Sequence, residues 1–426
     1  MKKILVTAYA VNPYKGSEDG MGWNFILQIA KLNYVVAVTR KNNRTSIERY
    51  FDEHDELNEL KQRITFLYFD WPQQLLWWKK GPLLSMIYFY FWQLSCAVWL
   101  RRRKLNVDIV HNLNFHNDWT PSFLWLLNKP FVWGPVGHHP KIPKQFILPV
   151  YGYKAYLKDR LLWVLKEFFW TVDPFLFITR KMAAHIICMN SDVACHLHPP
   201  SKKYSIIPSV AVEPPVLNND KQQEFFNVLS VGRIEPLKGF DITAKSFARF
   251  YHQLTKEQQF KARLTLVGSG SQLDNIKQLV RRENIEQCTQ IIEWQPREEV
   301  KRLYQNASVF MFPSHEGAGM VVAEAMSYKL PVICWDNSGP GEFIHPSSML
   351  SIPYQSYQVS VNRFAKRIQL LFEDKMLYQK ESTMAYGRYN DYLKWELRSK
   401  QLNEIYSTCY KQEVAPGTIH TRQSLT

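Results

Sequence analysis

The sequence of 426 residues lacks the features that mark several common protein classes. Its six cysteines are scattered without a framework spacing, which argues against a disulfide-stapled secreted domain and favours reduced thiols in the cytoplasm. No Gly-Lys-Ser/Thr follows the glycine-containing loop near the N-terminus, so a Walker A loop is excluded there. No Asp-x-Asp pair occurs, and the run around Gly268-Ser269-Gly270 lacks the third glycine of a dinucleotide fingerprint. We therefore expect neither a metal ion nor a bound cofactor.

Acidic residues are also scarce, with 38 Asp and Glu against 53 Lys and Arg, and the net charge is +15. This balance suits an anionic partner such as nucleic acid, an anionic membrane or a phosphorylated substrate. Many basic residues lie in helix flanks instead of forming one stripe, so nucleic acid is the least favoured partner. The 14 Trp and 22 Tyr favour sugar stacking or a membrane interface.

The order of apolar runs and turn residues predicts an α/β protein with two domains. A strand at Lys3–Ala8, a loop with three glycines and a helix at Trp23–Lys31 form a βαβ opening, and the first apolar run is too short for a signal peptide. The same alternation restarts at Phe226 and predicts a doubly wound parallel sheet. The proline-rich run Ser209–Asp220 predicts the boundary. We expect a first domain at 1–210, a second at 211–385, a helix at 386–412 and a polar tail at 413–426.

Residues 77–104 differ in character from the rest of the first domain. No charge occurs from Gly81 to Leu100, while basic residues and tryptophans lie at both ends of this run. A transmembrane helix, a buried helix, and a helix that also dips into an anionic membrane all remain open. Gln93 and the α/β pattern on both sides make the spanning alternative the weakest. We expect a cytoplasmic protein that is peripheral at the inner face of the cell membrane.

The stretch from Phe310 to Pro340 reads as strand, loop, helix and strand. The helix is expected to begin after Gly319, and its unpaired N–H groups can bind an anion. Glu316 in the loop and Glu324 in the helix, with seven residues between them, can accept hydrogen bonds from sugar hydroxyls. Glu324 lies among apolar residues that usually exclude a lone carboxylate, which favours a role in a cleft. The pattern predicts a nucleotide-sugar site.

Two cations lie in the loop after the first strand of the second domain. Arg233 and Lys238 suit a diphosphate, since Arg binds as a fork and Lys as a point charge. A solvated surface loop is the alternative. Both this loop and the Gly319-Met320 helix start are expected at carboxyl ends of strands of one sheet, which favours the diphosphate site.

These motifs together resemble a known family. The second domain carries V-G-R-I-E-P-L-K-G, V-G-S-G and P-S-H-E-G-A-G-M-V-V-A-E-A-M, and the chain also has G-S-E-D-G-M-G-W, W-G-P-V-G and N-S-G-P-G-E. The set is similar to retaining glycosyltransferases of family 4, in particular bacterial polysaccharide-type members. The resemblance implies the GT-B fold, in which two Rossmann-like domains face each other across a cleft and the C-terminal helix crosses back to the first domain.

The resemblance also implies roles for particular residues. The catalytic candidates are Arg233, Lys238, Glu316 and His138. The donor-binding candidates are Gly16, Gly232, Arg233, Lys238, Gly268, Glu316, Gly319, Met320, Val321 and Glu324. The acceptor-side candidates are Glu18, Trp23, His111 and His116. Among the histidines, His138, His111 and His116 are alternatives for the residue facing the donor sugar.

The expected function is retaining, metal-independent transfer of a hexose from a nucleotide sugar to a lipid-linked or polysaccharide acceptor. A nucleotide-sugar epimerase or a phosphorylase-like enzyme on the same fold is the alternative. A basic nucleic-acid-binding protein is a further, weaker one.

Overall fold

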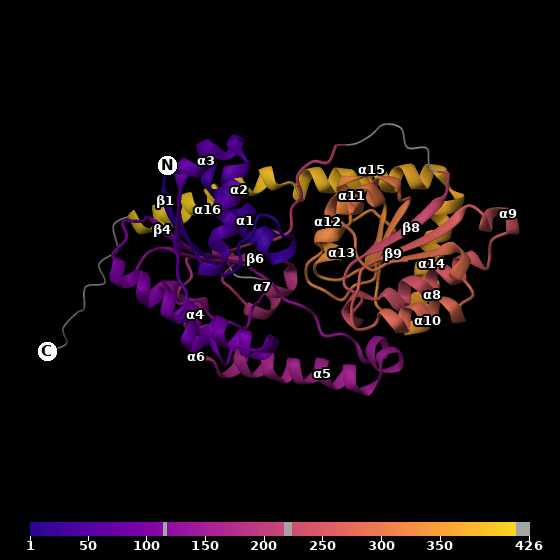
Figure 1. The fold of residues 1–426 in the computed structure, drawn as a ribbon, viewed down its shortest axis with the longest axis horizontal. Coiled ribbons are helices and arrows are strands. Elements are labelled where there is room, and N and C mark those ends of the chain that lie inside the picture. Colours follow the sequence, from indigo (N-terminus) through magenta and orange to yellow (C-terminus); the bar gives the residue numbers. More distant parts are fainter. Residues whose placement is uncertain (114–116, 217–223, 415–426) are drawn as a thin grey trace.

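The structure, a computed structural model, describes residues 1–113, 117–216 and 224–414. It contains two parallel sheets, one in each half of the molecule (Figure 1). The first has the order β3-β2-β1-β4-β5-β6-β7 and the second the order β10-β9-β8-β11-β12-β13. The first-sheet strands are β1 Lys3–Ala8, β2 Tyr34–Thr39, β3 Ile64–Tyr68, β4 Ile109–Leu113, β5 Phe131–Val136, β6 His185–Cys188 and β7 Tyr204–Ile206. The second-sheet strands are β8 Phe226–Val231, β9 Ala262–Val267, β10 Thr289–Ile292, β11 Val309–Phe312, β12 Val332–Trp335 and β13 Ser351–Ile352.

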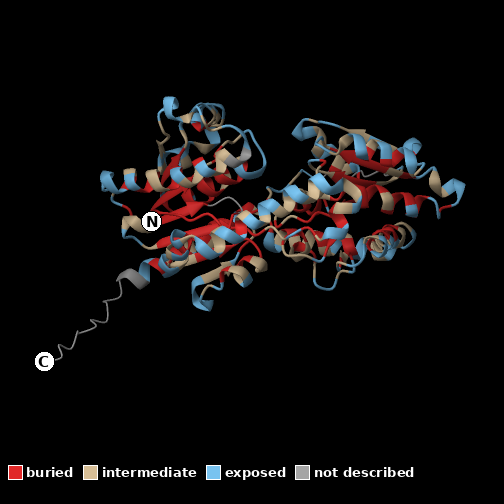
Figure 2. Ribbon diagram, turned by 90° about the horizontal axis from the view of Figure 1, so that it is seen from below, coloured by how far each residue is buried: buried red, intermediate tan, exposed pale blue. Residues whose placement is uncertain are grey.

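Helices cover both sheets, and the strands lie in the buried interior (Figure 2). Strand β11 is a continuous apolar run, as expected for a parallel strand that is covered on both faces. The helices before β8 are α1 Ser17–Ala30, α2 Arg44–Glu53, α3 Asn58–Arg63, α4 Gly81–Arg103, α5 Lys144–Val172, α6 Pro174–Met182 and α7 Ser191–Leu197. Those after it are α8 Phe240–Tyr251, α9 Lys256–Gln259, α10 Leu273–Arg282, α11 Arg297–Asn306, α12 Met320–Ser327, α13 Pro340–Phe343, α14 Tyr357–Glu373, α15 Lys375–Tyr392 and α16 Trp395–Val414. The predicted α/β class is confirmed.

The chain crosses between the domains earlier than the sequence analysis expected. After β5 it enters the second domain, where Ile142, Phe146 and Ile147 are buried in the core that also contains Phe240 and Trp335. The start of α5 is held there as well, and it lies under the second domain in Figure 1. A break at Gly152 (φ 79°) separates this start from the long part of α5 that returns to the first domain. Residues 142–156 therefore help to fill the core of the second domain, although they lie within the range predicted as the first.

A buried polar contact anchors this crossing. Asp241, the second residue of α8, accepts hydrogen bonds from the hydroxyls of Tyr151 on α5 and of Tyr357 on α14. Asp241 is buried, and burial raises the pKa of its carboxyl, with the two tyrosine hydroxyls acting in the opposite direction. The anchor lies at the start of the helix that follows the Arg233–Lys238 loop.

The C-terminal helices form a second crossing. The α15 helix packs on α12 in the second domain, while α16 packs on α1 and β4 in the first. The two helices are separated at Leu393, which is buried, and Arg398 in α16 donates to the carbonyl oxygens of Val210 and Tyr392. The predicted C-terminal helix is thus two helices, with the domain crossing at the break between them.

The α4 helix has one buried and one exposed apolar face. Tyr88, Trp92 and Cys96 are buried against the first sheet, while Ile87 and Phe91 are exposed. Over the described ranges, no helix combines the length and apolar character needed to cross a membrane. Core packing thus accounts for one face of α4, and contact of the other with a membrane stays a prediction.

Candidate functional site

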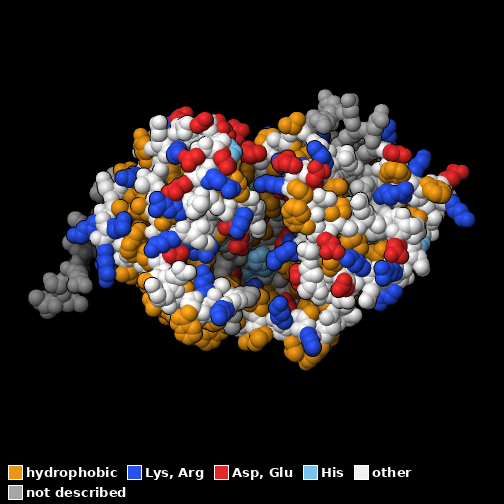
Figure 3. All heavy atoms as spheres, viewed as in Figure 1, with side chains coloured by type: hydrophobic (Ala, Val, Ile, Leu, Met, Phe, Trp, Pro, Cys, Tyr) orange, Lys and Arg blue, Asp and Glu red, His pale blue; other side chains and the backbone are white. Residues whose placement is uncertain are grey.

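The candidate site lies where the carboxyl ends of the two sheets meet. The space-filling view shows a hollow between the two halves, with basic, acidic and histidine side chains at its edges (Figure 3). The loop after β5, which begins at Gly137, contributes from the first domain. The loops after β8 and β11 contribute from the second. This is the position at which open α/β sheets bind ligands.

Two loops of the second domain form one unit at this edge. The ammonium of Lys238 makes an ion pair with the carboxylate of Glu316, and their side chains are only 13% and 12% exposed. The backbone N–H of His315 donates to the carbonyl oxygen of Leu237 at 2.8 Å. Gly239, the residue after Lys238, has φ 67°, and a Cβ there would lie 2.2 Å from the carbonyl oxygen of Pro313. The close approach therefore requires glycine and brings together two predicted site residues 78 positions apart.

The β8 and β9 loops approach each other equally closely. Gly268 has φ 144°, and a Cβ there would lie 1.8 Å from the carbonyl oxygen of Gly232. Glu235 and Ser271 join the same two loops further along. The carboxylate of Glu235 accepts hydrogen bonds from the backbone N–H and the hydroxyl of Ser271. Burial alone would raise the pKa of Glu235, but these hydrogen bonds and the charge of Arg233 outweigh it and lower the pKa. Arg233 itself is exposed at the edge of the site.

The α12 helix begins at Met320, directly after Gly319, as the sequence predicts. Glu324, one turn into the helix, accepts a hydrogen bond of 3.1 Å from the hydroxyl of Tyr304 on α11. Its other carboxylate oxygen lies 3.9 Å from the guanidinium of Arg297. Burial raises the pKa of Glu324, with Arg297 and Tyr304 opposing the change. Glu324 is therefore held at the α11 side, apart from the Lys238–Glu316 pair.

The first domain reaches the site through His138. Its Nδ1 lies 2.8 Å from the carboxylate of Asp118, and its ring stacks on Trp170 of α5. Asp118 is buried, so it holds the ring in one orientation. Asp118 was not among the predicted site residues. An acidic residue after a predicted strand was the available signal, but nothing in the sequence pairs it with a histidine twenty positions later.

The two domains also touch beside Glu316. Asn190 donates to the carbonyl oxygens of His138, at 3.1 Å, and of Gly317, at 3.0 Å. The N–H of Gly317 donates to Nδ1 of His139 at 3.1 Å. A Cβ on Gly317 would lie 1.8 Å from the carbonyl oxygen of His138, so glycine is required there too. Asn190 is a further residue that the sequence analysis missed.

Two acceptor-side candidates lie in the core instead. Both ring nitrogens of buried His111 are used, Nδ1 by the Tyr406 hydroxyl at 2.6 Å and Nε2 by the carbonyl oxygen of Gly134 at 2.7 Å. Burial lowers the pKa of His111 to about 4, so the ring is neutral and ties α16 to the first sheet. Trp23 packs edge-on against Tyr50 and Phe51 and is also buried. Apolar packing and α16 thus cover these two side chains in this structure, and their acceptor-side roles stay predictions.

The remaining candidates are less informative. Gly16 precedes α1 and Glu18 lies in its first turn, both exposed. Val321 is partly exposed in the first turn of α12. His116 lies outside the described residues. In the part of the chain that the structure covers, no group of three or more His, Cys, Asp or Glu is arranged to hold a metal ion, and metal independence stays a prediction.

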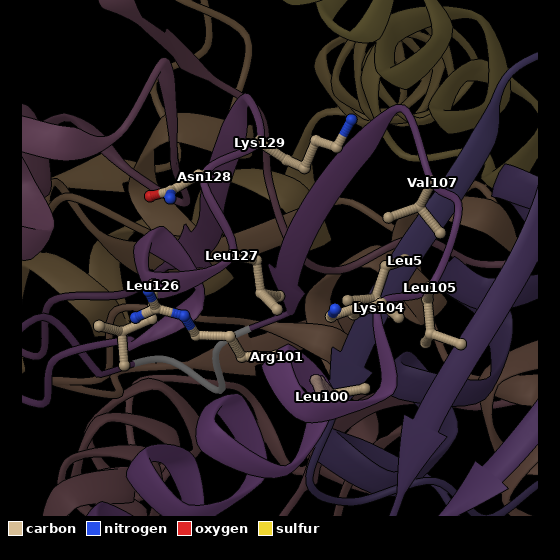
Figure 4. Close-up of a pocket in the computed structure, with 10 residues that line it drawn as sticks. All are labelled: Leu5, Leu100, Arg101, Lys104, Leu105, Val107, Leu126, Leu127, Asn128 and Lys129. Atoms are coloured by element: carbon tan, nitrogen blue, oxygen red, sulfur yellow. The ribbon is translucent and has the colours of Figure 1, made fainter.

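A separate pocket of about 190 Å³ lies at the opposite edge of the first sheet (Figure 4). It is formed where α4 ends and the chain enters β4, so it faces away from the cleft. Its floor is apolar and its basic residues are Arg101, Lys104 and Lys129. It is not part of the candidate site.

Comparison with known proteins gives a family match for the second domain. Residues 216–389 match the sequence model of the family Glycosyl transferases group 1. The amylovoran biosynthesis glycosyltransferase AmsK of Erwinia amylovora is 26% identical over 155 residues, which are 34% of this chain and 37% of that protein. The glycosyltransferase AmsD of the same organism is 27% identical over 180 residues, 42% of this chain and 47% of that protein. The matched regions thus span less than half of these curated relatives.

Solved structures resemble the whole chain. A glycosyltransferase from Rickettsia africae ESF-5 has a TM-score of 0.63 at 16% identity and covers 96% of this chain and 99% of its own. Anabaena Alr3699/HepE in complex with UDP and glucose has a TM-score of 0.60 at 12% identity and covers 96% and 100%. At such identities the likeness concerns the fold. The protein therefore has the GT-B fold of two Rossmann-like domains, and its second domain matches the group 1 glycosyl transferases.

Proposed function

We propose that this protein is a retaining glycosyltransferase that moves a hexose from a nucleotide sugar to a glycan or lipid-linked acceptor without a metal ion. The observation that carries the proposal is the Lys238–Glu316 pair, nearly excluded from water at the carboxyl ends of the strands, between the start of α12 and the His138–His139 loop. The group 1 match of the second domain and the bacterial polysaccharide glycosyltransferases among its relatives support a donor and an acceptor of these classes.

The second domain would stabilise the leaving group. As the bond to the sugar breaks, negative charge builds on the diphosphate. Lys238, Arg233 and the N–H groups at the start of α12 would interact with that charge more strongly in the transition state than in the ground state. In this structure the Lys238 ammonium is held by Glu316, so donor binding would exchange a carboxylate partner for a phosphate one. Glu316 would then be released toward the hydroxyls of the sugar.

The first domain would contribute the other wall. His138 would face the donor sugar, with Asp118 holding its ring. Glu324 would accept from the ribose hydroxyls after exchanging its contact with Tyr304. Because the Asn190 bridge joins the two walls, movement of the domains would break and re-form contacts directly beside the reacting sugar.

The location of the protein is also part of the proposal. We place it in the cytoplasm, peripheral at the inner face of the cell membrane, with residues 77–104 in contact with anionic lipid. The exposed Ile87 and Phe91 on α4 support this contact.

The proposal is tested by donor binding followed by product analysis. Thermal shift against UDP-, GDP- and ADP-sugars should show stabilisation by one class, weakened in Lys238→Ala and kept in Lys277→Ala, a control cation of the same domain that pairs with Glu293. Nucleoside diphosphate should then appear only when an acceptor is added. Release without any acceptor, or interconversion of the nucleotide sugar, would favour the epimerase or phosphorylase-like alternative. A donor response that is equal in both variants would contradict the role of Lys238.

A further inference from the structure

The second half of α5 has its apolar side turned to the outside. A stripe of apolar side chains recurs at spacings of three and four residues, which places them on one helical face. The side chains of Leu161 and Val164 are 72% and 66% exposed. Because large apolar side chains are normally buried, these values show that the stripe faces outward. The exposed members of the stripe are Leu157, Leu161, Val164, Phe168 and Val172.

The inward face of the same helix carries a charged residue, Lys166. Lys166 is buried, and burial lowers the pKa of its ammonium while Asp118 and Asp159 oppose the change. Trp163 and Trp170 flank it and pack around His138. The helix therefore turns a lysine inward and leucines outward, the reverse of a surface helix in water. This pattern indicates that the outer environment of α5 is not water alone.

Neighbouring helices extend the apolar surface. Phe175 and Phe177 on α6 are exposed, and the hydroxyl of Tyr90 on α4 donates to Asp173 between α5 and α6. Hydrophobic side chains gather along the lower edge of the molecule in Figure 3, where Figure 1 places α4, α6 and α5. A group of exposed apolar side chains of this kind marks an interaction site. We call the exposed residues Leu157, Leu161, Val164, Phe168, Val172, Phe175 and Phe177 the α5–α6 face.

Charges at the ends of this face are basic. Lys154 and Lys158 are exposed near its start and Lys181 beyond its end, with one exposed acid, Glu167, between them. An anionic bilayer is complementary to such a surface, since its acyl region accepts the apolar stripe and its headgroups accept the lysines. A second copy of the chain fits less well, because two-fold packing in either direction would bring basic ends together.

We propose that the α5–α6 face docks on an anionic membrane, with the α5 axis parallel to the membrane plane. This inference rests on the proposed function, in which the acceptor is lipid-linked, and it identifies the surface that would contact the lipid. The inward side of α5 touches His138, which the proposed function places facing the donor sugar, so the bilayer would lie about one helix diameter, roughly 10 Å, from that histidine. A sugar acceptor anchored in lipid would then reach the cleft without leaving the membrane surface.

The test uses the full chain and vesicles of phosphatidylcholine with or without phosphatidylglycerol, in a flotation assay at low salt. Wild type should float with the anionic vesicles. Loss of two exposed apolar contacts in Leu161→Ser/Val164→Ser should weaken binding about a hundredfold, at about tenfold for each side chain. The matched control is Phe260→Ser, since Phe260 is 74% exposed on the second domain. Both substitutions replace exposed side chains, and thermal melting of each variant confirms folding.

A further pair of variants distinguishes the surfaces. Ile87→Ser/Phe91→Ser on α4 tests the segment 77–104 by itself. Binding that depends on α4 and not on Leu161 and Val164 would overturn the α5–α6 face while leaving a membrane contact of the proposed function. Wild type that fails to float, or a lipid-free dimer that becomes monomeric in Leu161→Ser/Val164→Ser, would also overturn it. Donor thermal shift on the same samples reports separately on the transferase proposal.

Discussion

The Lys238–Glu316 pair offers the sharpest test of the site, through Lys238→Ala. The substitution removes the cation expected to meet the diphosphate, and loss of one such contact costs roughly 3 kcal/mol in the transition state, or about a hundredfold in turnover. It also leaves the Glu316 carboxylate in a position that is only 12% exposed. An unpaired carboxylate with so little water destabilises a protein by about 3 kcal/mol. The single variant therefore combines a catalytic and a structural effect.

A double-mutant cycle separates the two effects. Glu316→Gln in the Lys238→Ala background removes the uncompensated charge, so calorimetry should show the apparent melting temperature returning toward wild type. Turnover should stay at least about a hundredfold low, because the cation is still missing. Rates are measured as nucleoside diphosphate release with acceptor present, at saturating donor, and Lys277→Ala serves as the control for loss of a surface cation.

Two results would refute this reasoning. Near-normal turnover of correctly folded Lys238→Ala would show that the lysine does not stabilise the leaving group. Recovery of turnover together with stability in the double variant would show that Lys238 acts only by neutralising Glu316.

Three further predictions follow from the structure. Asp118→Asn, which weakens the hold on His138, should lower turnover about tenfold while leaving the donor thermal shift unchanged; an equal loss of donor binding would contradict a role limited to the first domain. Gly239→Ala, at φ 67° and with no room for a Cβ, should destabilise the protein by more than about 1 kcal/mol, whereas Gly387→Ala, at an open position inside helix α15, should stabilise it by about 0.5–1 kcal/mol in thermal melts. Because the folded-state pKa of His111 is lowered, its stability contribution is complete above pH 6.5 and is lost as the pH falls toward about 4, by about 3 kcal/mol in all; from pH 7 to 4 the wild type should lose about this much more stability than His111→Asn, and equal losses would show that His111 titrates normally.

Local sequence patterns were enough to predict the α/β fold of the second half of the chain. Its strands are short apolar runs followed by glycine-containing loops, and parallel sheets place such loops at one edge. This geometric rule predicted that the Arg233–Lys238 loop and the start of α12 would lie at one edge of the same sheet, although the ion pair between Lys238 and Glu316 was not foreseen. The start of α12 at Met320 was predicted from the helical spacing of apolar residues that follow Gly319.

Long-range packing could not be predicted in the same way. His111 lies in the middle of β4, but in the sequence it stands near the end of an apolar run, where a polar residue suggests a ligand. Its partner Tyr406 comes 295 residues later, and that contact makes it a core residue. Trp23 presents the same difficulty, since its covering residues come from α2 and β3. The crossing at residues 142–156 has apolar residues compatible with either domain, and no local signal states which core they fill.

That crossing has a consequence for how such a chain can be divided. A fragment that starts at residue 211 would lack Phe146 and Ile147, which fill its core. A fragment that ends at residue 211 would expose these two side chains, and it would also expose the surface of the first domain that α16 covers. Large-to-small changes at such buried positions cost several kcal/mol each, and a truncation removes all of them at once. Chimeras that exchange one half for that of a relative should therefore fold only if residues 142–156 and α16 are transferred with the core that each fills. Recombination at the apparent boundary is thus a poor route to new donor and acceptor combinations in this protein.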